Sequence, residues 1–218
     1  MKNLVLGLCA LGLLAACGDD NGGNDSGGGS KTLLVQGNVG FDEGDNVAEM
    51  HVTVLREGVG VNDATVTLRS DLGEVTLVRA TDKNGEYYGN QAGWAGSYRL
   101  EVSAGDDGLH GSIAAPELMQ LVTPEQTEAI DAHALPEGVL TLRWSGGSAD
   151  SIRVRSADFD YEGVDEGHVD MPAVMLKESS QELRLRRSNE IALAGGVDGS
   201  TLSASCGSDF TLIVVNPY

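Results

Sequence analysis

The sequence predicts an all-β protein with two β-sandwich modules in tandem, and three observations support this fold class. Apolar and polar residues alternate over short segments after residue 31, as in strands with one covered face. Glycine, proline, asparagine and aspartate separate the segments, and Asn84-Gly85 is typical of a tight hairpin. No stretch has the apolar spacing of a convincing long helix.

The first thirty residues differ in composition from the rest. Lys2 precedes a charge-free apolar run from Leu4 to Leu14, which is typical of a secretory signal and too short for a spanning helix. The run ends in Leu14-Ala15-Ala16-Cys17. Residues 18–30 contain no apolar side chain, so they predict a flexible tether.

Leu14-Ala15-Ala16-Cys17 resembles the lipobox of bacterial lipoproteins. The resemblance implies cleavage between Ala16 and Cys17, removal of residues 1–16 as a signal peptide, and acyl chains such as palmitate on Cys17. In that family, aspartate directly after the cysteine favours the inner membrane. Gly18 stands there, so the resemblance points to the outer membrane of a cell with two membranes. The alternative is an ordinary secreted protein with a chance cysteine.

The charge balance excludes some classes of binding partner. Lysine and arginine number 14 against 33 acids, for a net charge of -19. This argues against nucleic acid and against charge-driven binding to anionic lipid. Attachment to a membrane is therefore expected to come from acyl chains, each methylene of which contributes about 0.8 kcal/mol when buried.

The cysteines predict no internal disulfide. Of three, Cys9 leaves with the signal and Cys17 is expected to be acylated, which leaves Cys206 alone. We expect Cys206 to be a small, buried or half-buried side chain before a turn at Gly207-Ser208-Asp209. A reactive or intermolecular thiol is the alternative.

The first module is expected over residues 31–116. An acidic loop that carries Asp42 and Glu49 follows its first strand. Pro116 ends its last strand. The expected strands are residues 33–39, 50–55, 61–68, 74–80, 95–104 and 108–115.

Residues 47–104 carry a pattern of alternating positions. Ala64, Val66 and Leu68 are followed by Thr81-Asp82 with Gly85 and Tyr87, and then by Gly96, Tyr98, Leu100 and Val102. The pattern resembles bacterial immunoglobulin-like and carboxypeptidase regulatory-like β-sandwiches. The resemblance implies a module that supports or binds and rarely catalyses.

The second module is expected over residues 117–218. A strand leading into Thr123-Pro124 opens it, and an alternating strand ends near Trp144. The spacing of short strands around an early tryptophan is similar to fibronectin type III-like domains. The further strands expected are residues 138–145, 151–156, 169–176, 182–187, 190–194, 201–206 and 210–215.

One acidic segment resembles the start of a calcium loop. Asp158, Asp160 and Glu162 occupy alternate positions before Gly163, so their carboxylates could converge on one hard cation. Asp165 and Val169 depart from the rest of the twelve-residue motif. The alternative is a solvated acidic loop without a metal, and no other cofactor is indicated.

Five arginines alternate with apolar residues on expected strands of the second module. If these strands share a sheet, the guanidiniums line its outer face and could bind an acidic polysaccharide or a partner protein's carboxylates. The alternative is cross-strand ion pairs with acids such as Glu182 and Glu190. The five are Arg143, Arg153, Arg155, Arg184 and Arg186.

No catalytic signature is present. The four histidines are scattered, and the sequence has no His-Glu-x-x-His, Gly-x-Ser-x-Gly, Cys-x-x-Cys or phosphate-loop motif. We therefore expect a non-enzymatic, membrane-anchored surface or periplasmic lipoprotein that binds or scaffolds. The alternatives are a structural envelope component without a soluble ligand and a hydrolase with an unrecognised site.

Overall fold

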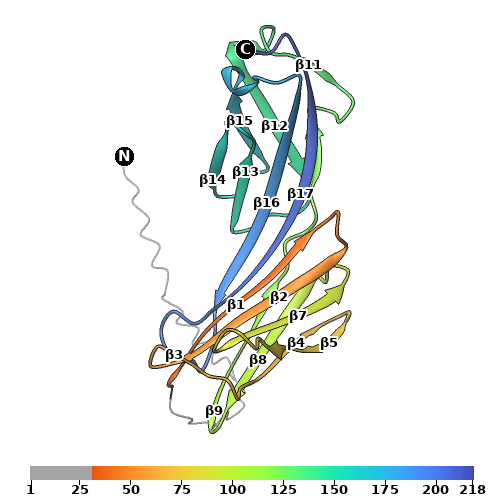
Figure 1. Cartoon of the computed structure of the whole chain (residues 1–218). Coiled ribbons are helices and arrows are strands. Elements are labelled where there is room, and N and C mark those ends of the chain that lie inside the picture. Colours follow the sequence, from red (N-terminus) through yellow and green to blue (C-terminus); the bar gives the residue numbers. More distant parts are fainter. Residues whose placement is uncertain (1–30) are drawn as a thin grey trace, which may run out of the picture.

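The computed structural model describes residues 31–218 and confirms the all-β fold class. Two β-sandwich modules are stacked end to end in an elongated molecule, with the start of β1 at one end and the C-terminus at the other (Figure 1). The signal peptide, cleavage site, lipid-attachment cysteine and tether that the sequence predicts all lie outside the described residues. Within residues 31–218, no helix is long and apolar enough to cross a membrane.

The first module packs a four-stranded sheet against one half of a ten-stranded sheet. The smaller sheet has the order β5 (Gly73–Thr76), β4 (Thr65–Ser70), β8 (Ser97–Ala104), β9 (Asp107–Ala114). Facing it in the large sheet are β1 (Leu33–Asp42), β2 (Val47–Arg56), β7 (Glu86–Ala92) and β6 (Val78–Arg79), with β3 (Val59–Gly60) paired to β2.

The second module packs a three-stranded sheet against the other half of the large sheet. The three-stranded sheet has the order β10 (Gln120–Thr123), β12 (Val139–Ser145), β15 (His168–Pro172). Opposite it lie β14 (Asp160–Gly163), β13 (Ser151–Arg155), β16 (Ser180–Ala192), β17 (Thr201–Val215) and β11 (Ala129–Asp131). Two 3-10 turns, Pro136–Gly138 and Ala173–Met175, complete it.

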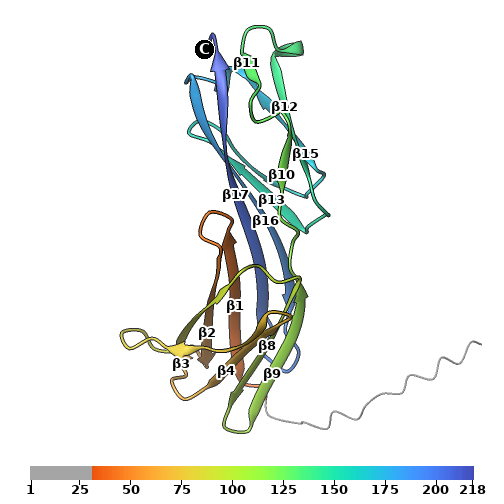
Figure 2. The ribbon, with the colours of Figure 1, turned by 90° about the vertical axis from the view of Figure 1, so that its right-hand side faces the viewer.

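One long hairpin belongs to both modules. β16 and β17 pair without interruption from Ser180↔Ile213 to Ala192↔Thr201, and Figure 2 shows them running from one module into the other. The first part of β17 also pairs in parallel with β1, from Gln36↔Thr201 to Asp42↔Gly207. The hairpin therefore carries one sheet through the whole length of the molecule.

The two cores divide this hairpin between them. The core of the first module contains Leu193, Leu202, Ala204 and Cys206 beside residues from β1, β2, β4 and β8. The core of the second module contains Leu183, Leu185, Phe210, Leu212 and Val214 beside Trp144. The first module therefore contains residues from both sides of the boundary that was expected near residue 116.

The structure corrects three strand limits expected from the sequence. Gly207-Ser208-Asp209 continues β17, because Gly207 is paired on one side with Asp42 and on the other with Arg186. Residues 182–187 and 190–194 likewise belong to the single strand β16, up to Ala192. The expected strand over residues 74–80 changes sheets at buried Leu77, between β5 and β6.

The junction between the modules is held by buried polar groups. Trp94 Nε1 donates to the Pro116 carbonyl at 2.8 Å, and Arg187 Nη1 donates to the Glu117 carbonyl at 3.3 Å. Arg187 Nε lies 2.6 Å from Asp165 Oδ2, and both side chains are 1% exposed. The other oxygen of Asp165 accepts a hydrogen bond from Trp144 Nε1 at 2.9 Å. This network ties the connecting segment to β16 and to the second core.

Candidate functional site

Four of the five arginines singled out in the sequence share the outer face of the large sheet. Arg153 lies opposite Arg186 and Arg155 opposite Arg184 across the β13–β16 pair. Arg143 does not join them, because β12 belongs to the three-stranded sheet on the other side of the sandwich. The sequence pattern placed each arginine on a strand but could not assign the strand to a sheet.

Acidic residues flank this arginine block on both sides. Arg153 makes a two-point contact with Asp160, at 2.7 and 2.9 Å, and Arg184 makes one with Asp209, at 2.7 and 2.8 Å. Arg186 pairs with Asp42 at 2.7 Å. One row therefore reads Asp160, Arg155, Arg184 and Asp209 across β14, β13, β16 and β17. The other row begins with Glu162, Arg153 and Arg186, passes Gly207 on β17, and ends at Asp42 on β1.

The ion pairs shift the pKa values of the groups that form them. The hydrogen bonds from Arg153 and Arg184 hold the pKa values of Asp160 and Asp209 below the ordinary aspartate range, and Asp209 in turn raises the pKa of Arg184. Positive and negative charges balance within the rows, as in the cross-strand ion pairs weighed above, although Glu182 and Glu190 are not the partners. An anion-binding role for this face stays a prediction.

The carboxylates of the calcium hypothesis face cationic side chains. Asp158 lies 2.8 Å from Lys177 Nζ, and Asp160 and Glu162 both face Arg153, Glu162 at 3.8 Å. Asp160 and Glu162 belong to β14 and not to a loop. Within residues 31–218 no group of three or more histidine, cysteine, aspartate or glutamate side chains is placed to hold a metal ion. Calcium binding stays a prediction without a geometric basis here.

Cys206 is a buried side chain in the first core. It is 1% exposed, and its thiol lies 3.5 Å from the Glu117 carbonyl and 3.7 Å from the Pro116 carbonyl. Burial raises its pKa to about 11. The thiol is therefore protonated and shielded at neutral pH.

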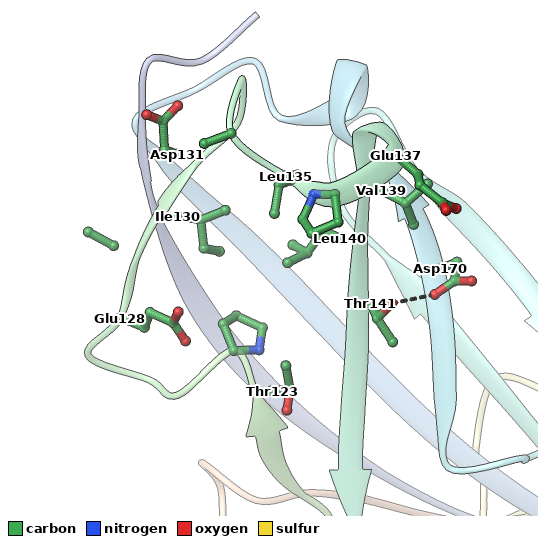
Figure 3. A pocket seen from close by; sticks show the side chains of 14 residues that line it. Thr123, Glu128, Ile130, Asp131, Leu135, Glu137, Val139, Leu140, Thr141 and Asp170 are labelled. Carbon is green, nitrogen blue, oxygen red and sulfur yellow. Dashed lines mark hydrogen bonds between the residues drawn. The ribbon is translucent and has the colours of Figure 1, made fainter.

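A pocket lies at the end of the second module, where the chain crosses between sheets. β10 pairs with β12 only from Gln120↔Ser145 to Thr123↔Arg143, and the chain then crosses to β11, which pairs with β17 in the large sheet. The first residues of β12, from Val139 to Thr141, therefore have a strand neighbour on one side only, namely β15. The space beside them is a cavity of about 510 Å³ (Figure 3).

The pocket has an apolar floor and an acidic rim. Ile130 from β11 and Leu140 from β12 are each 5% exposed and belong to the second core, and Leu135 packs against that core. Carboxylates surround this floor in Figure 3, with no lysine, arginine or histidine among the fourteen lining residues. The four acids are Glu128, Asp131, Glu137 and Asp170.

The rim is held in place by local hydrogen bonds. Asp170 accepts a hydrogen bond from the Thr141 hydroxyl at 2.7 Å. Asp131 accepts one from the His133 backbone N–H at 3.1 Å and one from the Asn216 side chain at 3.2 Å. Glu137 has a φ of 55°, a left-handed conformation that is uncommon for residues other than glycine. Such strained positions occur often at binding sites.

No sequence motif predicts this pocket. Pro124, Pro136 and Gly138 mark the irregular connection, but the site also needs Asp170 from β15 and Ile130 from β11. Only the fold brings these segments together.

No family model and no curated protein matches this chain. Among solved structures, it is similar to the Yersinia pseudotuberculosis adhesin InvE, with 16% identity, a TM-score of 0.27, and coverage of 84% of this chain and 60% of that one. Extracellular domains 3–5 of Drosophila OTK match with 11% identity, a TM-score of 0.27, and coverage of 81% and 61%. Domains 4–9 of the surface layer protein SbsC match with 16% identity, a TM-score of 0.26, and coverage of 84% and 31%.

The chain thus spans less than two thirds of each of these three structures. Because all three TM-scores are below 0.3, the assignment of two β-sandwich modules rests on the strands, sheets and cores described above.

Proposed function

We propose that this chain is a lipid-anchored protein of the bacterial cell envelope that binds or scaffolds and does not catalyse a reaction. The anchor part of the proposal rests on Leu14-Ala15-Ala16-Cys17 and on the polar residues 18–30 that follow. The acidic composition supports it, because a chain with 33 acids and 14 basic residues has little attraction for anionic lipid without acyl chains.

One structural observation carries the binding part. The β16–β17 hairpin runs through both modules, and β11, whose residues line the pocket, lies at the end opposite the start of β1 (Figure 1). A chain tethered just before β1 would hold that pocket away from the membrane on a single continuous sheet. This arrangement suits presentation of a site to a partner or ligand.

The lining of the pocket lacks the groups of one common catalytic arrangement. Its lining contains carboxylates and threonines but no serine, cysteine, histidine or lysine. A nucleophile paired with a histidine or lysine base therefore has no candidate there. Turnover by the purified protein on panels of ester, glycan and peptide substrates would contradict this part of the proposal.

Fatty-acid labelling tests the anchor. Cells that express the wild-type chain or Cys17→Ser are grown with radiolabelled palmitate and then fractionated. We expect label and membrane association in the wild type and neither in Cys17→Ser. A Cys17→Ser variant that still sediments with membranes would overturn the anchor, and the fraction that holds the wild type tests the outer-membrane expectation.

A structural envelope component is the second candidate, and the paired arginine block favours it. Each exposed arginine of the block already has an acidic neighbour within the chain, so the block has no unpaired positive charge to recruit an anionic partner. Altered envelope integrity in a deletion strain, together with a pure protein that retains no ligand, would favour this candidate over a binding module.

A further inference from the structure

We propose that the pocket between β11 and β12 binds a small organic cation that joins a charged head to an apolar body. This inference deepens the binding role proposed above by naming a ligand class. It needs three features of the pocket: an apolar floor, an unneutralised acidic rim and a preformed shape.

The floor provides a surface for the apolar body. Ile130, Leu135 and Leu140 line the cavity together with Pro124 and Pro136. The floor is continuous with the second core, since Ile130 and Leu140 are members of that core. A hydrocarbon chain placed there would replace water on an apolar surface, which favours binding.

The rim selects the charge of the head group. Glu128, Asp131, Glu137 and Asp170 are exposed or half-buried carboxylates, and none of them takes part in an ion pair of the described chain. On the outer face of the large sheet, in contrast, Asp42, Asp160 and Asp209 all have arginine partners. A cation in the pocket would supply the neutralising charge that this chain does not provide there.

The shape is that of a small-ligand site. A cavity of about 510 Å³ falls within the range of pockets for compact ligands. The Thr141–Asp170 hydrogen bond and the two hydrogen bonds to Asp131 already order parts of the rim. Little conformational entropy is therefore lost when a ligand enters.

A set of three matched probes tests the ligand class. Full-length Cys17→Ser protein is titrated with n-butylammonium, n-butanol or butyrate at pH 7 and low salt, and backbone amide shifts are followed by NMR. We expect butylammonium to shift amides of residues 123–141 and Asp170 at the lowest concentrations, butanol to bind more weakly, and butyrate to cause no shift there. The proposal is overturned if butylammonium leaves these amides unmoved or if butanol or butyrate binds as tightly.

Paired variants separate the rim from the general acidity of the protein. Glu128→Gln with Asp170→Asn removes two rim charges and keeps the Thr141 hydrogen bond, and we expect about fivefold weaker butylammonium binding. Glu182→Gln with Glu190→Gln removes the same charge from exposed positions of β16 and should bind as the parent does. If both double variants bound butylammonium equally weakly, the rim carboxylates would have no specific role in binding it.

The outcome does not depend on the anchor. Butylammonium binding is measured on a protein that lacks Cys17, so a failed titration removes the ligand class and leaves the labelling result intact. Loss of the anchor in the labelling experiment would equally leave the pocket result standing.

Discussion

Arg186 and Arg187 are neighbours on β16, yet they lie on opposite faces of the large sheet. Arg186 is on the outer face and pairs with Asp42 at 2.7 Å, with side chains 37% and 40% exposed. Arg187 points inward and pairs with Asp165 at 2.6 Å, with both side chains 1% exposed. The same kind of ion pair therefore occurs in water on one face and between two cores on the other.

This contrast shows that burial, more than the two charged groups themselves, determines how much an ion pair matters for stability. An exposed pair is screened by water and contributes about 0–1 kcal/mol. A buried pair gains little net stability over apolar residues, but the loss of one member leaves a charge that water cannot reach. The inner pair should therefore be costly to break, and the outer pairs should be nearly dispensable.

The largest effect is expected from the inner pair. Arg187→Met leaves Asp165 buried without a counter-charge, and we expect a loss of about 3–5 kcal/mol in the free energy of unfolding. Arg186→Met is the matched control, and it should cost less than about 1 kcal/mol. Urea denaturation followed by circular dichroism measures both. Similar losses in the two variants would remove the distinction between the faces.

The second prediction tests whether the inner junction couples the modules. Trp94→Phe leaves Trp144 as the sole tryptophan and a reporter of the second core. Adding Leu202→Ala, at a fully buried position of the first core, should cost about 2–5 kcal/mol. Because the hairpin is shared, we expect the Trp144 fluorescence midpoint in urea to fall with it. A Trp144 transition that stays in place would show that the modules unfold independently.

The ion pairs of Asp160 and Asp209 on the outer face should lose their contribution to stability at acidic pH. The pKa values of Asp160 and Asp209 are lowered in the folded state, so the unfolded chain binds protons first as pH falls. Their stabilising contribution is present above the unfolded pKa of about 4 and is lost as pH falls through the lower folded values. Urea midpoints measured between about pH 7 and pH 3 should therefore decrease, and Asp209→Asn should flatten that decrease. An unchanged slope in Asp209→Asn would show that its pair with Arg184 makes no contribution.

The last prediction concerns Cys206, which lies beside the junction, and it does not test an ion pair. In Cys9→Ser/Cys17→Ser it is the sole thiol. A pKa raised from 9.0 to about 11 lowers the thiolate fraction about a hundredfold, so labelling by a disulfide reagent at pH 8 should be at least that much slower in the folded protein than in urea. The labelling rates are measured by absorbance. Equal rates would place the thiol at the surface.

The strands were largely predictable, because alternation and turn residues act locally. The breaks expected within β16 and β17 were wrong, because strand pairing that the local sequence does not reveal keeps these segments extended. Gly207-Ser208-Asp209 has turn composition, but pairing with β1 on one side and β16 on the other holds it extended. The pairing with β1 depends on a segment more than a hundred residues away, and it overrides the local preference.

Arg187 was missed although a signal was present. Leu183 and Leu185 occupy inward positions of an alternating strand, and the same period places Arg187 on the core face. An arginine at such a position requires a buried partner, but its identity, Asp165, depends on the fold. The acids that neutralise the arginine block and the pocket between β11 and β12 likewise depend on how strands are assigned to sheets.

The parallel pairing of β1 with β17 also determines when the chain can fold. The Ser200 hydroxyl accepts a hydrogen bond from the Val35 backbone N–H across 165 residues, and Leu202 and Ala204 complete the first core. A nascent chain that has emerged only through the first module lacks the strand that covers one edge of β1. Contacts so distant in sequence form slowly, because a long loop must close first. For the exported protein that we propose, completion of the first module by β17 would keep that module open until β17 has crossed the membrane.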